Sequence, residues 1–485
     1  MKGTKEQIIK HKKKNVKIFP IYKTVSWDLL FYFPIIFLFL THIKGFTASQ
    51  VLFADAFYTL SNTFWQLPVT SLVDRIGKKN CLIIGNILYS LSILAMIFMK
   101  NYYELLIIQF IYALGYSIKG ICESNILYDS LPVGKKRGKI FSTIDGKSSS
   151  YFYFFDAISS VIAGFTFAIN GYIPMILCFI FCIISTIISF KFRHTAIIEE
   201  KVKSVSLKEY FEQLKDSFKF FKKSKRLKLL ILLNAVFIGL VFGIVNLRSS
   251  MLNEMKVPEE YFGIIFALLQ LAAAVTARQS NRIHNNFKNK TLTYLTIPVT
   301  ISCIIIGFIG GDPLSKSSLL LIFLLYLVQY AIKGPYQALI SRYLNNFTNR
   351  KMRPKITALK QLSANLFTAG VSALCAILLN ITTTANTFIV IGCISTIFSV
   401  LLLDYMRGKV GLKPEQYSKE ELMNNYKITK KEEETPKMSW QNLFLEIQLQ
   451  SKERQFAKRM EEYYVSNNKG NVLKINERRL RNWSI

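Results

Sequence analysis

Two lysines stand inside long apolar runs, where a charged side chain is costly. Lys119 lies in "YALGYSIKG", which begins at Tyr112, and Lys333 lies in "YLVQYAIKG", which begins at Tyr326. Two tyrosines, an isoleucine, the lysine and the glycine coincide between these stretches. A charge in the middle of a bilayer costs about 2.5–3.5 kcal/mol on insertion scales. The repeated lysine therefore predicts either a paired structural cation or a residue that meets a ligand.

Other ionisable and aromatic side chains are expected near these lysines. A helical rise of about 1.5 Å per residue places Lys119, Lys333 and Asp156 near the middle of the membrane. Lys119 could instead pair with Glu123, four residues along the same helix face, or with Asp156. Lys333 could bond to backbone carbonyls that Pro335 frees. The candidates for contact with a ligand or a coupled ion are Lys119, Lys333, Glu123, Asp156, Tyr116, Tyr330 and Asp55.

Long apolar segments must hold these residues. The chain has 485 residues, of which 51% are hydrophobic, and a mean hydropathy of +0.28. Its apolar runs are about 20 residues long, which is enough to cross a bilayer as a helix. Asp28 opens the first run, where an interaction with the helix dipole is expected. Twelve runs predict twelve transmembrane helices, centred near Pro34, Leu60, Leu91, Gly115, Ala157, Ile180, Val236, Leu269, Ser302, Val328, Leu366 and Phe398.

The charge distribution predicts the orientation of these helices. The chain carries 62 Lys and Arg against 30 Asp and Glu, a net charge of +32. Basic residues gather in alternate loops, which is the positive-inside pattern, so a nucleic-acid partner is not expected. We expect a multi-pass protein of the cell membrane with both termini in the cytoplasm. The basic loops carry Lys12, Lys13, Lys14, Arg75, Lys78, Lys79, Lys135, Lys136, Arg137, Lys222, Lys223, Arg282, Lys288, Arg350, Lys351 and Arg353.

A second repeat supports a division into two halves. Arg75-Ile76, in the loop after the second run, is matched by Arg282-Ile283 in the loop after the eighth. Together with the lysine repeat, this predicts an all-α integral membrane fold of two six-helix bundles in the same orientation. The expected parts are a basic cytoplasmic N-terminus (1–24), a first bundle (25–192), a cytoplasmic linker with an amphipathic helix (193–226), a second bundle (227–406) and a charged cytoplasmic tail (407–485).

The loop "LVDRIGKK", which begins at Leu72, resembles a signature of the major facilitator superfamily, G-x-L-A-D-R-x-G-R-K. The aspartate, arginine, glycine and two basic residues match, and Thr70 replaces the first glycine. The resemblance implies a secondary transporter in which charges of this loop latch the cytoplasmic side closed. The residues expected in this latch are Asp74, Arg75, Gly77, Lys78, Lys79, Asp129 and Arg282.

A narrower resemblance concerns the end of the fourth run, "KGICESNILYDSL". Efflux-type bacterial members of the superfamily often read S-G-x-x-x-A-x-x-x-D here; Gly120 and Asp129 match, and Lys119 replaces the serine. This implies export of an amphipathic compound, coupled to a proton or a sodium ion. The frequent Lys, Ile and Asn residues are typical of an AT-rich bacterial genome.

Two alternatives remain open. The first is a uniporter or symporter for an organic anion, attracted by Lys119 and Lys333. The second is a non-transporting receptor or scaffold that binds a cytoplasmic partner through its tail. No Gly-rich phosphate-binding loop occurs, so direct use of ATP is not expected. Cys178 and Cys182 have no histidine nearby, and no metal, cofactor or enzymatic activity is predicted. The expected partners are a small-molecule substrate and the lipid bilayer.

Overall fold

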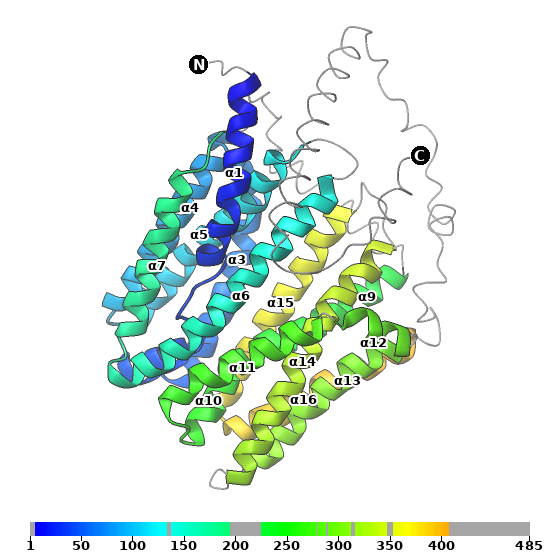
Figure 1. Cartoon of the computed structure of the whole chain (residues 1–485). Helices are drawn as coiled ribbons and strands as arrows, with labels where there is room; N and C mark the ends of the chain where they lie inside the picture. Colours follow the sequence, from blue (N-terminus) through cyan, green and yellow to red (C-terminus); the bar gives the residue numbers. More distant parts are fainter. Residues whose placement is uncertain are drawn as a thin grey trace.

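The computed structural model describes residues 5–132, 137–194, 225–277, 279–287, 290–311, 316–346 and 353–406, and the regular structure within them is all helical (Figure 1). The amphipathic helix predicted at 206–223 and the predicted tail at 407–485 lie outside these ranges. A basic helix, α1, covers most of the N-terminal segment, and it lies against α5, α6 and α7.

The first half runs from α1 to α7. Its helices are α1 (Lys5–Ser26), α2 (Ile36–Leu38), the π-helix η1 (Phe39–Ile43), α3 (Ala48–Ile76), α4 (Lys78–Phe98), α5 (Tyr102–Ser130), α6 (Arg137–Ile169) and α7 (Ile173–Phe190). The second half runs from α9 to α16. Its helices are α9 (Lys225–Gly243), α10 (Val245–Glu254), α11 (Glu259–Ala277), α12 (Ser280–Phe287), α13 (Thr291–Gly310), α14 (Lys316–Asn346), α15 (Arg353–Leu379) and α16 (Thr384–Tyr405).

Ten helical segments among the described residues are long and apolar enough to cross a membrane. Each contains the centre of one predicted run, from the third run to the twelfth. The second run lies in α3, which is 29 residues long and contains Leu60. A multi-spanning helical membrane protein is therefore the class that length and composition define.

The first run is not the continuous helix that its hydropathy predicts. α1 ends at Ser26, residues 27–35 form turns, and only α2 and η1 resume the helix. Two residues explain the break: Phe31 adopts a left-handed φ of 64°, and Pro34 has no N–H to donate. Asp28 accordingly follows a helix rather than opening one, which corrects the expectation of a helix-dipole role.

The seventh run is also interrupted, between Gly243 at the end of α9 and Val245 at the start of α10. Each half thus begins with a broken helix. A break inside the membrane leaves carbonyl groups that the helix itself cannot satisfy. Side chains must supply the missing donors, and Lys119 and Arg248 do so here.

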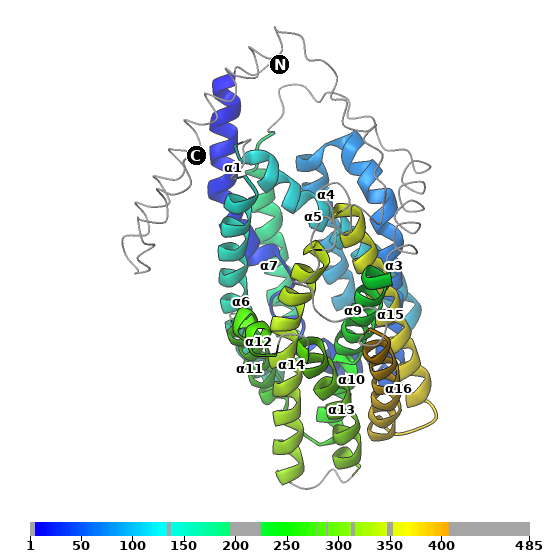
Figure 2. The ribbon, with the colours of Figure 1, turned by 90° about the vertical axis from the view of Figure 1, so that its right-hand side faces the viewer.

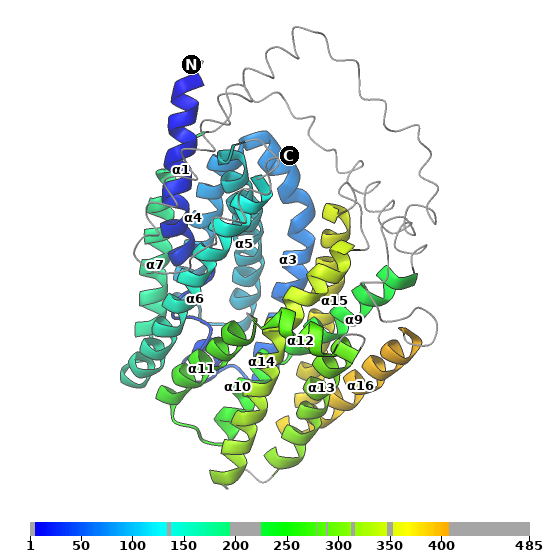
Figure 3. The same cartoon turned by 45° about the vertical axis from the view of Figure 1, so that its right-hand side comes forward.

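The halves meet along two helix pairs, α6 with α11 and α3 with α15 (Figures 2 and 3). Glycines allow the first pair to approach closely. A Cβ on Gly263 would lie 2.1 Å from the carbonyl oxygen of Ser160, and one on Gly164 would lie 2.6 Å from that of Glu260. Since real Cβ atoms do not come this near to backbone, these two positions require glycine at the observed spacing.

Candidate functional site

Lys119 is buried in α5 and held by contacts within the first half. Its ammonium donates a hydrogen bond to the carbonyl oxygen of Trp27 at 3.1 Å. It also stands 4.8 Å from the ring centroid of Tyr89. The carboxylates that act on it electrostatically are Glu123 and Asp28, neither within direct ion-pair distance among the described residues. Lys119 is thus a neutralised cation that caps the carbonyl left free where α1 ends.

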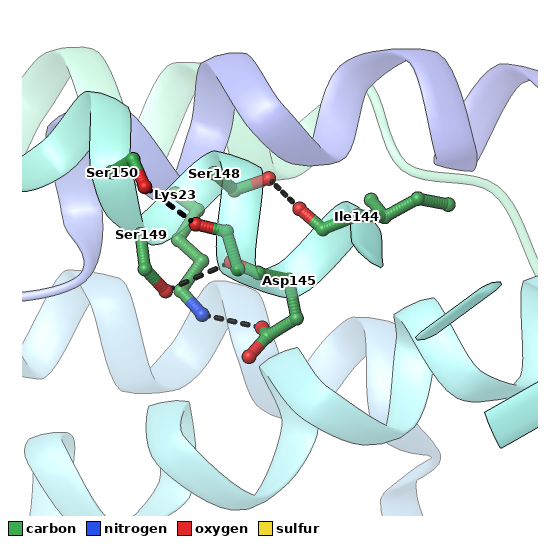
Figure 4. A network of polar contacts seen from close by, with 7 residues as sticks. Lys23, Ile144, Asp145, Ser148, Ser149 and Ser150 are labelled. Carbon is green, nitrogen blue, oxygen red and sulfur yellow. Dashed lines mark hydrogen bonds and ion pairs between the residues drawn. The ribbon is translucent and has the colours of Figure 1, made fainter. Parts of the chain in front are cut away.

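A cavity of about 70 Å³ adjoins Lys119, large enough for a few water molecules. A second cation, Lys23 of α1, lines this cavity and stands 4.6 Å from the centroid of the Trp27 ring. It forms an ion pair with Asp145 of α6 (Figure 4). The same figure shows serines of α6 bonding to carbonyls of their own helix. The cavity is lined by Lys23, Trp27, Tyr116, Lys119, Gly120, Glu123 and Ser124.

Tyrosine rings form one cluster beside this cavity. The ring of Tyr112 lies 4.9 Å from that of Tyr89 and 5.0 Å from that of Tyr58, measured between centroids. Tyr116 lies 6.4 Å from both Tyr58 and Tyr89. The hydroxyl of Tyr89 is 3.3 Å from that of Tyr112 and donates to Asp28 at 3.3 Å. The cluster joins the aromatic wall to the charges around Lys119.

Lys333 of α14 has different surroundings. Its ammonium stands 4.4 Å from the ring centroid of Phe242 and 4.8 Å from that of Tyr330. Among the described residues it has no hydrogen bond, and no carboxylate lies within ion-pair distance. The carbonyls near Pro335 do not bind it, in contrast to the alternative that the proline suggested.

A buried arginine contacts the same tyrosine. The guanidinium of Arg248, on α10, lies 5.0 Å from the ring centroid of Tyr330 and donates to the carbonyl oxygen of Val241. The residue is 4% exposed, and its Nε has no hydrogen-bond partner. Arg248 therefore caps the break after α9, as Lys119 caps the break after α1, and retains an unused donor.

Two carboxylates lie where the halves face each other. Asp156, on α6, is 4% exposed and accepts no hydrogen bond at its carboxylate from the described residues. Its charge acts on Tyr330 of the other half, while no contact joins it to Lys119. Asp55, on α3, accepts a hydrogen bond at 3.3 Å from Ser372 of α15. Ser372 also donates to the carbonyl of Gly243, at the break before α10.

The loop between α3 and α4 ties down its own half. Gly77 turns the chain with a φ of 89°, a left-handed value that favours glycine. Lys78, which follows it, forms an ion pair with Asp129 at the end of α5. Lys79 lies near Arg193, and Arg75 and Arg282 are exposed. The side chain of Asp74 lies outside the described ones. The ion pair of this loop stays within the first half.

Arg248, Lys23 and the Trp27 carbonyl were missed by the sequence analysis. Arg248 follows the seventh apolar run in a stretch that also holds Asn246, Ser249 and Ser250, so the sequence around it does not indicate burial. The Trp27 carbonyl could not be found from the sequence either, because the break that frees it follows from local backbone conformation.

Polar contacts between the halves gather at one end of the molecule. His42, at the end of η1, lies 2.8 Å from Glu259 and 2.9 Å from Asn253. Ser49, at the start of α3, donates to the carbonyl of Ala376 at 2.7 Å. The bond from Ser372 to Asp55 lies slightly deeper. At the opposite end, the ion pairs of Lys23 and Lys78 join elements of the first half only.

Two bundles that meet at one end, with charged and aromatic side chains between them, define a helical membrane transporter. Three solved structures share the fold at low sequence identity. A mutant of the nucleoside transporter NupG matches with a TM-score of 0.62 and 11% identity, over 82% of this chain and 99% of that one. A POT family transporter in complex with 5-aminolevulinic acid matches with a TM-score of 0.60 and 14% identity, over 83% and 97%.

A bacterial homologue of the human lysosomal transporter Spinster, in an inward-facing and unoccupied conformation, matches with a TM-score of 0.53 and 14% identity, over 83% of this chain and 96% of that one. A comparison with curated protein sequences finds no match. The sequence profile of the Major Facilitator Superfamily matches residues 19–332. The chain belongs to this superfamily, and it is a multi-pass membrane transporter rather than an enzyme.

Proposed function

We propose that the protein is a secondary active transporter of the cell membrane that exports a small amphipathic compound by alternating access. Twelve crossings in two six-helix halves, residues 25–192 and 227–406, carry the movement, and both termini lie in the cytoplasm. The observation that supports the proposal is that, among the described residues, the polar contacts of His42, Ser49 and Ser372 between the halves lie at or near the same end of the molecule.

The orientation follows from the basic loops. Their described residues include Arg75, Lys78 and Lys79, in the loop at the end of the first half opposite to His42, and the positive-inside rule assigns that end to the cytoplasm. In this proposal the end that holds His42 is the outer end and is closed, a state from which a transporter accepts a cytoplasmic substrate for export. The neighbouring structure described as inward-facing supports the same assignment by analogy.

The candidate residues take distinct roles in this proposal. Tyr116 and the tyrosine cluster supply an apolar wall for the substrate, and Tyr330 supplies the facing wall. Asp156 and Asp55 are the candidates for binding the coupled proton or sodium ion, because each lies at the interface without a cation in direct contact among the described residues. Lys78 and Asp129 form a weak, half-exposed ion pair in the region of the proposed latch, which also includes Asp74.

Distances between spin labels in the two halves test alternating access. One pair replaces Ser49 and Ala376 at the outer end, and a second pair replaces the exposed residues Ser124 and Gln337 nearer the inner end. We expect two populations in liposomes, in which the outer distance is short when the inner distance is long. A single fixed distance for both pairs, under all ion gradients and membrane voltages, contradicts the proposal.

Removal of the chain after Arg407 separates transport from a scaffold function. A transporter retains the exchange between its two populations without the tail, because the helices that move lie before residue 407. If the shortened protein still exchanges but the cell loses its phenotype, the tail-dependent scaffold becomes the better description.

A further inference from the structure

A constant offset in residue number relates the charged sites of the first half to those of the second. Lys333 follows Lys119 by 214 positions, and Val241 follows Trp27 by the same number. The relation is also structural, because Trp27 and Val241 each present a carbonyl oxygen at the break in the first helix of a half. In the first half the lysine caps this carbonyl, whereas in the second half Arg248 does so. Lys333 is thereby released from the role that Lys119 fulfils.

The carboxylates around Lys119 have no counterparts around Lys333. The position equivalent to Asp28 is Phe242, and the position equivalent to Glu123 is Gln337. The structure agrees with this correspondence, since the Lys333 ammonium lies 4.4 Å from the ring of Phe242, where the first half has a carboxylate. Two positive charges, on Lys333 and Arg248, thus share Tyr330 with no carboxylate in ion-pair distance among the described residues.

Asp156 of the other half acts electrostatically on Tyr330, the ring that both cations contact. The buried guanidinium keeps its Nε without a partner. Two desolvated cations that share one ring are unfavourable unless an anion joins them. Among the described residues no carboxylate, Asp156 included, lies within ion-pair distance of either cation.

We infer that Lys333 and Arg248 bind the acidic group of the substrate, which is an organic anion with an aromatic or other planar portion. This inference rests on the proposed transport function and names its substrate class. A carboxylate or a phosphate can accept hydrogen bonds from the guanidinium and the ammonium together. Tyr330 and Phe242 offer ring faces for the planar portion. Lys119 is not part of the proposed anion site, because its ammonium already donates to the Trp27 carbonyl and lies near Glu123 and Asp28.

Charge-selective labelling tests the site without knowledge of the substrate. In the full chain, Phe242→Cys places a thiol beside Lys333, and Ser124→Cys places a control thiol beside Glu123. Each variant reacts with an anionic and a cationic methanethiosulfonate of similar size, and the unsubstituted chain supplies the background from its own cysteines. We expect the anionic-to-cationic rate ratio to be roughly tenfold higher at Phe242→Cys, and to fall when Lys333→Gln is added. Three results would overturn the inference. The rate ratios could be equal at the two positions, the ratio at Phe242→Cys could stay unchanged when Lys333→Gln is added, or neither reagent could reach the Phe242→Cys thiol.

Thermal unfolding of the purified full chain with four naphthalene probes provides a second readout that needs no reporter cysteine. We expect 2-naphthoate or 2-naphthyl phosphate to raise the melting temperature, and 2-naphthylmethanol and 2-naphthylmethylammonium to leave it unchanged. The two anions distinguish a carboxylate site from a phosphate site, and acetate and inorganic phosphate show whether the ring is needed. The shift should disappear in Lys333→Gln. No shift from either aromatic anion, or an equal shift from the neutral or cationic probe, contradicts the inference.

The two proposals fail in different ways. Labelling and unfolding measure a charged site and do not require movement, whereas the spin-label distances require movement and do not depend on the site. If the spin labels show exchange between two populations but labelling shows no preference for anions, the anion-site inference is wrong and alternating access is still supported. Anion preference in a protein that never exchanges would end the proposed function.

Discussion

A lysine inside a membrane protein needs a partner, and the two repeated lysines have different ones. Lys119 donates to a backbone carbonyl and lies near two carboxylates, while Lys333 contacts the rings of Phe242 and Tyr330 and makes no hydrogen bond among the described residues. For both lysines, the sequence repeat predicts either a paired structural cation or contact with a ligand. It does not separate their roles, because the difference depends on residues 28, 242 and 248, which lie far away in the chain.

The two lysines should differ when each is replaced by glutamine. Lys119→Gln removes the cation that balances Glu123 and Asp28 and weakens the cap on the Trp27 carbonyl. Loss of one member of a buried charge group typically costs about 3–5 kcal/mol, so a clearly lower melting temperature in detergent is expected. Lys333→Gln is the matched control and should melt close to the parent. Equal melting temperatures for the two variants would show that Lys119 has no structural role.

The ion pair of Lys78 and Asp129 should contribute little to stability. Its side chains are 40% and 33% exposed, and such pairs contribute at most about 1 kcal/mol. A double-mutant cycle with Lys78→Gln and Asp129→Asn should give a coupling free energy below this value, and the coupling should weaken at high salt. A weak pair suits a site that reorganises during a cycle. A salt-independent coupling of several kcal/mol would instead identify a permanent structural tie.

At the scale of elements, hydropathy predicts ten membrane-spanning segments well and the first run poorly. The third to twelfth runs coincide with these segments because each is a long apolar stretch, although the seventh is divided between α9 and α10. The first run fails because Phe31 and Pro34 determine the backbone between α1 and α2, and the mean hydropathy of a window contains no φ angle. The close approach of α6 and α11 also escapes sequence analysis, since Gly164 and Gly263 resemble any other glycine of a transmembrane helix.

A methyl group at Gly263 should disturb the contact between the halves. Its carbon would lie 2.1 Å from the carbonyl oxygen of Ser160, so α6 and α11 must separate. Gly263→Ala is therefore expected to shift the protein away from the outwardly closed state, which a longer distance between spin labels at positions 49 and 376 would reveal. Gly370→Ala, on α15 and with nothing within 4 Å of its added carbon, is the control. The same distance distribution in both variants would rule out this role for the glycine pair.

At the scale of the whole molecule, the repeats predict two similar halves, and the relation between Trp27 and Val241 extends that similarity to the breaks in their first helices. The contacts that close one end do not follow from the repeat. His42, Asn253 and Glu259 come from different halves and have no matched partners at equivalent positions, so only their arrangement in space brings them together.

The contacts of His42 should favour the outwardly closed state. His42→Ala removes both bonds to the second half, and because His42 and Glu259 are more than a third exposed, the expected change is about 1 kcal/mol or less. This corresponds to a shift of up to roughly fivefold in the ratio of the two populations. The spin labels at positions 49 and 376 report this ratio. An unchanged ratio would mean that the helix contacts alone close this end.

The cap on the Trp27 carbonyl has a consequence for biogenesis. The first crossing leaves the ribosome with an interrupted backbone. The donor to its free Trp27 carbonyl is Lys119 of α5, which is synthesised about ninety residues later. Hydrocarbon offers no replacement for that donor. We therefore expect the first crossing to wait in the translocon, or beside water, until α5 arrives. Nascent chains that end before residue 102 should remain crosslinked to the insertion machinery, whereas chains that extend past residue 130 should leave it, and Lys119→Leu should delay the release.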